Sequence, residues 1–133
     1  MKGTYALLMH LEDDKNIRIG SLGSIDFLKG HYLYIGSGMN GIEGRVRRHL
    51  RDKKKNHWHI DYFLEKVKIT NVYYINKKRE CILANNFSQK FEVVPRFGSS
   101  DCNCKGHLFY GGHRELVDCA LQNRLSILNL TEL

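Results

Sequence analysis

Tyr34, Arg45 and His49 bring three chemically useful groups into one short stretch of this sequence. A guanidinium matches the geometry of a phosphate group, and a phenol or an imidazole can take up or release a proton. The residues between the tyrosine and the arginine include four glycines, which allow sharp backbone conformations and leave room around larger groups: Gly36, Gly38, Gly41 and Gly44. The residue types and their spacing therefore predict a functional site.

A strand and a helix are predicted to position these groups. Residues 31–35 are aromatic and β-branched, which suits a half-buried strand ending at the glycines. A helix is expected after the glycines, with an apolar stripe for the core formed by Ile42, Val46 and Leu50. Arg45 and His49 repeat the same four-residue spacing about 100° round the helix. Their side chains would flank the packed face and reach over the end of the strand.

Length and composition are typical of one globular domain spanning residues 1–133, with 42% hydrophobic and 26% charged residues. The apolar run near the N-terminus is too short for a signal sequence, and no stretch approaches the roughly 20 apolar residues that cross a bilayer. We therefore expect a cytoplasmic protein with no membrane partner. Its four cysteines would stay reduced there. The oligomeric state is left open.

Positive charge gathers directly behind the candidate site. The net charge is +7, and seven of the eleven residues at positions 45–55 are basic. Such a run favours a polyanion, most commonly a nucleic acid backbone. A solvated helix face would have the same composition. Beyond Arg45, the residues predicted to bind DNA are Arg47, Arg48, Arg51, Lys53, Lys54 and Lys55.

The hydrophobic pattern predicts an α+β fold, a small, mainly antiparallel sheet of three to four strands flanked by helices. Residues 4–11 should form the first strand, and residues 17–19 a second strand that pairs with it as a hairpin. A further strand is expected at residues 67–75 and a helix from Glu80. A Cys/His loop and a helix, at about residues 97–123, should pack on this domain.

Five positions, taken in order, resemble the motifs of the GIY-YIG nuclease superfamily. The segment 3–5, Gly-Thr-Tyr, is similar to the first motif, and 34–36, Tyr-Ile-Gly, to the second. The run 45–49 is similar to the family's helix, which carries an arginine and a His or Tyr four residues later. Glu80, opening a later helix, matches the family's acidic residue. The insertion at residues 12–30 resembles the Uri-like, archaeal-type branch of the superfamily.

The resemblance implies a metal-dependent DNA endonuclease that hydrolyses phosphodiester bonds and acts in DNA repair or processing. The implied catalytic residues are Tyr5, Tyr34, Arg45, His49 and Glu80. Glu80 would bind one Mg²⁺ or Mn²⁺, and Arg45 would stabilise charge that develops on the phosphate. Tyr5 is the preferred general base, provided that nearby positive charge favours its phenolate. Tyr34 or His49 could take the proton instead.

Two other functions fit parts of the sequence. The fold and its basic helix would suit a non-catalytic nucleic-acid-binding module. Cys102, Cys104 and His107 are zinc-type ligands within six residues, and would suit a zinc-stabilised accessory domain of a repair complex. The same spacing also fits reduced thiols packed in a loop. Further candidate ligands are His57, His59 and Asp61. DNA is favoured over RNA by the resemblance alone, and no preferred DNA structure is indicated.

Overall fold

The computed structural model describes residues 1–52 and 54–133. The strands are β1 (Gly3–Leu11), β2 (Lys15–Arg18), β3 (Ser24–Phe27), β4 (Gly30–Gly38), β5 (Lys68–Ile75), β6 (Glu92–Val93), β7 (Leu108–Gly111) and β8 (Ser126–Ile127). The α-helices are α1 (Ile42–Leu50), α2 (His59–Leu64), α3 (Glu80–Ser88) and α4 (His113–Gln122). Short 3-10 turns lie at Gly20–Leu22 and Leu130–Glu132. Within the described residues, no helix is long and apolar enough to span a membrane.

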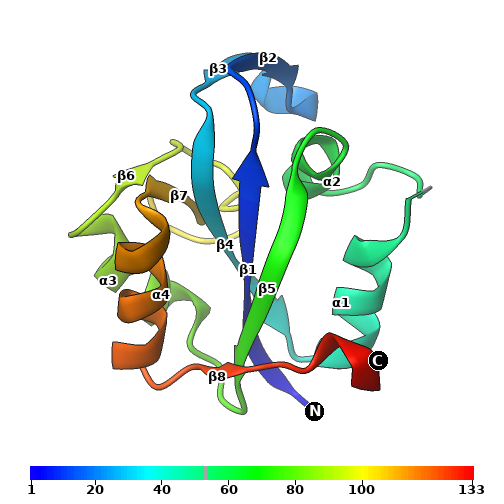
Figure 1. The fold of residues 1–133 in the computed structure, drawn as a ribbon, viewed down its shortest axis with the longest axis vertical. Coiled ribbons are helices and arrows are strands. Elements are labelled where there is room, and N and C mark those ends of the chain that lie inside the picture. The colour runs from blue at the N-terminus through cyan, green and yellow to red at the C-terminus, as the bar shows by residue number, and fades with distance from the viewer. Residues whose placement is uncertain (53) are drawn as a thin grey trace.

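The main sheet confirms the predicted α+β class and its antiparallel pairing. Six strands lie in the order β6-β7-β4-β1-β5-β8, with four helices beside them (Figure 1). The sheet is wider than the three to four strands expected, because the short strands β6, β7 and β8 extend it at its edges. The predicted hairpin between residues 4–11 and 17–19 is wrong. Both edges of β1 are taken by β4 and β5, so β2 pairs with β3 in a separate two-stranded sheet.

β1 is a central strand, and its alternating side chains build a core on each face of the sheet. Tyr5, Leu7 and Met9 belong to a core with residues of α1 and α2. Ala6 and Leu8 belong to a second core with residues of α3 and α4. All five are at most 1% exposed, and full burial of a large apolar side chain contributes about 1.5–3 kcal/mol. The helices accordingly lie in two layers with the sheet between them (Figure 1).

Helix α1 packs through a stripe different from the predicted one. Ile42 and Val46 are fully buried, as expected, but Leu50 is 40% exposed. The buried position in the last turn is taken by His49, which is 3% exposed. The helix ends at Leu50 and Arg51 is extended, so in the last turn the side chain that continues the buried face of Ile42 and Val46 is that of His49. An imidazole is therefore built into the core.

The edge of β4 becomes open along its last residues. β7 pairs with β4 from His31 to Tyr34, and the Ile35 N–H then donates to the carbonyl of His107. No described strand pairs with this edge from Gly36 to Gly38. Side chains from the two layers of helices can therefore meet around this edge.

Candidate active site

A pocket of about 610 Å³ lies at this open end of β4. Three of the five predicted catalytic side chains line it: Tyr34 from β4, Arg45 from α1 and Glu80 from α3. α1 lies against one face of the sheet and α3 against the other, so the open edge is what allows the two helices to share a pocket (Figure 1). The rim also includes Lys78 and Asp101. The pocket thus offers a phenol, cationic groups and carboxylates.

Tyr5 and His49 lie directly behind the Tyr34 side chain. The Tyr5 hydroxyl and His49 Nε2 are 2.6 Å apart in a buried hydrogen bond. The centroid of the Tyr34 ring lies 6.5 Å from that of Tyr5 and 6.4 Å from that of His49. Neither residue is more than 3% exposed. All five predicted catalytic residues therefore form one contiguous group, three at the pocket and two behind it.

Gly36 gives the Tyr5 ring its place beside the pocket. The two residues are directly opposed on β4 and β1. A Cβ atom at position 36 would lie only 2.5 Å from the Tyr5 hydroxyl oxygen, so any larger residue would displace the phenol. Gly36 itself lines the pocket. The Tyr5 hydroxyl consequently lies one residue beneath the pocket surface.

Thr4, the middle residue of the first motif, holds the turn that delivers Glu80. Its hydroxyl donates to the carbonyl of Lys77 at 2.8 Å and accepts from the N–H of Arg79 at 2.8 Å. The same hydroxyl lies 3.4 Å from Glu80 Oε2. Glu80 also opens α3, where the helix dipole favours a negative charge. These contacts to the segment before α3 explain a threonine at position 4, and the sequence did not predict them.

Trp58 supports the guanidinium that faces the pocket. The centre of the Arg45 guanidinium lies 4.3 Å from the centroid of the Trp58 ring, within the range of a cation–π contact. Such stacking leaves the edge of the guanidinium, with its N–H donors, available for an anion in the pocket. The Arg45 side chain is therefore held in position by Trp58, and it forms no salt bridge with an acidic side chain among the described residues.

Burial controls the protonation of the buried groups. It raises the pKa of Tyr34, and the positive charge of Arg45 opposes this effect without cancelling it. The pKa of Tyr5 is likewise raised, by burial first and by Tyr34 second. Burial lowers the pKa of His49 to about 4. At neutral pH the resting site thus holds two neutral phenols and a neutral imidazole that can accept a proton.

Because the His49 imidazole is buried, we expect the protein to lose stability as the pH falls. Since the folded pKa of His49 is about 4 and the unfolded value is about 6.5, the unfolded chain takes up a proton first as the pH falls. The neutral His49 imidazole therefore makes its full contribution to the free energy of unfolding above about pH 6.5. This contribution, on the order of 3 kcal/mol, is lost as the pH falls towards 4. Urea unfolding across this range should show a steeper decline for the wild type than for His49→Gln. Parallel curves would contradict the assignment.

Comparison with known proteins places the chain in a family. The model of the family described as "Domain of unknown function DUF123" matches residues 4–129. The chain belongs to this family. No curated protein and no solved structure matches it.

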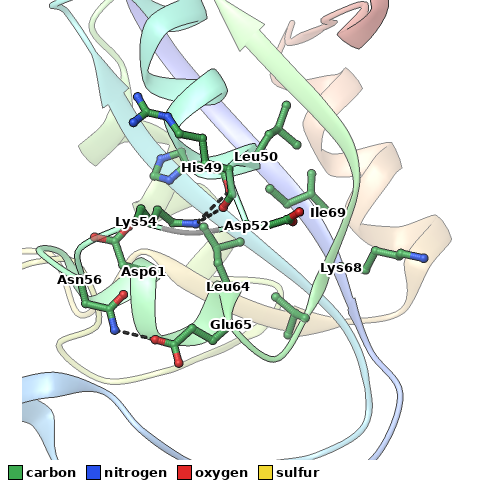
Figure 2. A pocket seen from close by; sticks show the side chains of 12 residues that line it. His49, Leu50, Asp52, Lys54, Asn56, Asp61, Leu64, Glu65, Lys68 and Ile69 are labelled. Atoms are coloured by element: carbon green, nitrogen blue, oxygen red, sulfur yellow. Dashed lines mark hydrogen bonds between the residues drawn. The ribbon is translucent and has the colours of Figure 1, made fainter.

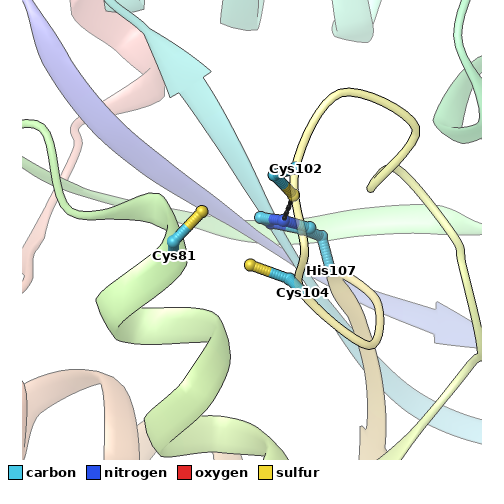
Figure 3. A group of neighbouring side chains, drawn as sticks. All are labelled: Cys81, Cys102, Cys104 and His107. Carbon is cyan, nitrogen blue, oxygen red and sulfur yellow. Dashed lines mark hydrogen bonds between the residues drawn. The ribbon is translucent and has the colours of Figure 1, made fainter.

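The DUF123 chain also contains a group that could hold a metal ion. Three thiols and one imidazole converge from α3 and the loop before β7, with all four donor atoms within 4.8 Å of one another: Cys81, Cys102, Cys104 and His107 (Figure 3). Burial, with the neighbouring thiols of Cys81 and Cys102, raises the pKa of Cys104 to about 12. The sequence had indicated three of these residues and missed Cys81. Its position directly after Glu80 was the available signal.

The other candidate metal ligands have different roles. Asp61 is fully buried, and its carboxylate accepts hydrogen bonds from both terminal nitrogens of Arg48, at 2.7 and 2.8 Å. The same carboxylate accepts hydrogen bonds from the backbone N–H groups of His57 and Trp58. His59 accepts a hydrogen bond from the N–H of Gly98 at 2.9 Å. These contacts fix α2 and the loop beside it. Neither side chain joins the group that could hold a metal.

The predicted DNA-binding residues divide into two sets. Arg48 is engaged by Asp61, and Lys54 Nζ donates to the carbonyls of His49 and Arg51, at 3.3 and 2.8 Å, which satisfies the end of α1. Exposed side chains are Arg47, Arg51 and Lys55. Lys53 lies outside the described residues. The exposed set remains free to bind an anion, although Arg51 lines a different pocket; Lys78 is a further cationic side chain that lines the candidate active site.

A second pocket, of about 660 Å³, lies on the other side of His49 (Figure 2). Lys54, which donates the two hydrogen bonds to the end of α1, lines this pocket. On the same lining, the Asn56 side chain donates a hydrogen bond to the Glu65 carboxylate at 2.6 Å. His49 is the only predicted catalytic residue among those that line it. Its Nδ1 has no hydrogen-bond partner among the described residues. His49 thus separates the candidate active site from this second pocket.

Proposed function

We propose that this chain is a Mg²⁺-dependent DNA endonuclease of the GIY-YIG type, which hydrolyses phosphodiester bonds in cytoplasmic DNA repair or processing. The observation that supports this most strongly is the convergence of Tyr34, Arg45 and Glu80 in one pocket, with the hydrogen-bonded Tyr5–His49 pair behind it. These residues come from elements far apart in the sequence, and their groups are those that phosphodiester hydrolysis needs.

The residues at the pocket fit a magnesium ion. Mg²⁺ keeps several waters and uses one or two carboxylates together with substrate phosphate oxygens. Glu80 offers a carboxylate in a polar pocket, and Asp101 lies on the same rim. When bound, the ion would polarise the phosphate and neutralise charge on its oxygens. Mn²⁺ has the same ligand preferences and would be accepted in its place.

The remaining side chains would bind the phosphate and move the proton. Arg45, held against Trp58, would donate two parallel hydrogen bonds to phosphate oxygens and stabilise the pentacovalent transition state. The attacking water must lose a proton as its oxygen bonds to phosphorus and the bond to the leaving oxygen breaks. Tyr5 would accept this proton as its own passes to His49 Nε2, 2.6 Å away. This concerted transfer avoids a resting phenolate, which burial disfavours.

Tyr34 is the alternative base, since it lines the pocket directly while Tyr5 lies beneath Gly36. In the Tyr5 version, Tyr34 instead forms the pocket wall and orients the water through its hydroxyl. The two assignments predict opposite rankings of the tyrosine variants.

DNA contact is assigned to the exposed basic residues of α1, of the segment after it and of the pocket lining. Arg47 is exposed on α1, Arg51 and Lys55 are exposed in the segment that follows it, and Lys78 lines the pocket together with Glu80. Contacts of this kind are made to the phosphate backbone and carry no base specificity. A structure-dependent or non-specific substrate is therefore part of the proposal.

Arg45 and Arg47 provide a matched pair of arginines on one helix. We expect Arg45→Ala to lower kcat by about 10²–10³-fold, because charge on the transition state loses a positioned donor. Arg45→Lys should recover little of this loss, because lysine lacks the planar pair of donors. Arg47→Ala should mainly weaken DNA binding and reduce its salt dependence, with kcat nearly unchanged. Single-turnover cleavage and binding titrations separate the effects, and equal losses of kcat would contradict the role of Arg45.

The direct test is a cleavage screen of the purified protein over single-stranded, nicked, flapped, branched and plain duplex DNA, with Mg²⁺ or with EDTA. The proposal expects Mg²⁺-dependent cleavage of at least one of these substrates. Salt-sensitive binding with no cleavage of any substrate would instead support the non-catalytic nucleic-acid-binding module, to which the exposed basic residues are equally suited.

A further inference from the structure

We propose that Cys81, Cys102, Cys104 and His107 bind one Zn²⁺, which fastens the loop at residues 96–107 to the first turn of α3. This site is separate from the proposed Mg²⁺ site and does not depend on nuclease activity. It would make the loop and the start of α3 into one rigid wall of the active-site pocket.

The positions of the four donor atoms suit a single tetrahedral ion. Cys102 Sγ and His107 Nε2 are 3.3 Å apart, and all four donor atoms lie within 4.8 Å of one another (Figure 3). With Zn–S bonds of about 2.3 Å, neighbouring ligand atoms of a tetrahedral site are about 3.5–4 Å apart. Only small side-chain adjustments would close the group around an ion. A cluster of several irons would hold its ligands farther apart.

The ligand types favour zinc. Three thiols and an imidazole are the Cys₃His set typical of closed structural zinc sites, whereas Mg²⁺ prefers oxygen ligands. Zinc also provides a reason to gather three thiols here, because a bound ion stabilises its thiolate ligands. A disulfide would use two of the three sulfurs and leave the third thiol and the imidazole unexplained.

The backbone around the loop already brings its two ends together. The Arg96 N–H donates to the Lys105 carbonyl at 2.6 Å, and the His107 N–H donates to the Phe97 carbonyl at 2.7 Å. These bonds fix the base of the loop next to β7, but they do not join it to α3. Cys81 is the ligand supplied by α3. Metal binding would therefore add the missing connection between the two segments.

This connection would act directly on the proposed active site. Cys81 follows Glu80, whose turn is held on its other side by Thr4. Cys81, Cys102 and His107 line the same pocket as Glu80. The zinc site would consequently hold the Glu80 carboxylate and the loop residue Asp101 at fixed positions across the pocket.

The test begins with metal analysis of the full chain, purified under reducing conditions without chelator. We expect one zinc per chain. Reconstitution of the metal-free protein with Co²⁺ should give thiolate-to-cobalt charge-transfer bands and the visible bands of a tetrahedral site. Cys81→Ser and Cys104→Ser should each weaken Zn²⁺ binding by about 100-fold or more. Cys119→Ala provides the matched control, because this fourth cysteine is buried in α4 outside the group and should leave the metal content unchanged.

A second measurement tests the connection itself without using nuclease activity. Arg96 and Lys105 are exposed trypsin sites at the two ends of the loop. Removal of zinc by a chelator should increase the rate of cleavage at these sites and lower the thermal midpoint by about 10 °C or more. Protein without zinc and without cobalt bands, or a disulfide between two of the three thiols in the reduced preparation, would overturn the proposal. Zinc binding with unchanged proteolysis would overturn the fastening role.

Discussion

Glu80→Ala is expected to abolish Mg²⁺-dependent DNA cleavage, with a loss of about 10³-fold or more in kcat, while DNA binding is retained. Glu80 is the carboxylate that α3 delivers to the pocket, and the positively charged side chains that would hold DNA do not depend on it. The measurement is a single-turnover cleavage assay beside a fluorescence-anisotropy binding titration. A wild-type Kd combined with lost cleavage would assign the residue to the chemical step.

The control for this variant is Glu12→Ala, which removes an exposed carboxylate between β1 and β2. It should cleave DNA at the wild-type rate. Thermal unfolding and zinc content of Glu80→Ala should match the wild type, so that a disturbed Cys81 is not mistaken for a lost magnesium ligand. Full cleavage by Glu80→Ala would remove the carboxylate from the mechanism and with it the proposed magnesium site.

Tyr5→Phe is expected to reduce kcat by about 10²–10⁴-fold, the range typical of a lost general base. The variant keeps the ring over Gly36 but removes the hydroxyl bonded to His49. His49→Gln should give a similar loss, and the double variant should be little worse than either alone, because residues that act as one unit are not additive. Tyr34→Phe should have a smaller effect, since its ring would still form the pocket wall.

Single-turnover rates of these four variants decide between the two phenols. Tyr110→Phe is a suitable control, because it removes a hydroxyl bonded to the Lys29 carbonyl at 2.9 Å, outside the pocket. If Tyr34→Phe is the more damaging variant, Tyr34 is the base. Additive losses from Tyr5→Phe and His49→Gln would rule out direct proton transfer between them.

Local patterns in the sequence predicted those elements whose own residues determine them. The strand at residues 4–11 was predicted from a nearly continuous apolar run, which suits a strand buried on both faces, and the helix from Glu80 was predicted from the helical spacing of its apolar residues. The short strands β6 and β8 were not predicted. Each of these strands has only two residues, which is too short to show a recognisable period. They become strands because β7 pairs with the backbone of β6 and β5 pairs with the backbone of β8. The role of Arg48 was similarly hidden, because its partner Asp61 lies thirteen positions away on α2.

The sequence by itself determined the α+β class and the types of group available for chemistry: phenols, a guanidinium, an imidazole, a carboxylate, thiols and many cations. These follow from composition and from periods of a few residues. Only the tertiary structure decided which groups meet. The end of β7 pairing leaves β4 open at Gly36, so that Glu80 and Arg45 share a pocket although their helices pack on opposite faces. The tertiary structure also brings Cys81 next to Cys102, Cys104 and His107 and buries His49 in the core. Such contacts depend on how whole elements pack and not on neighbouring residues in the sequence.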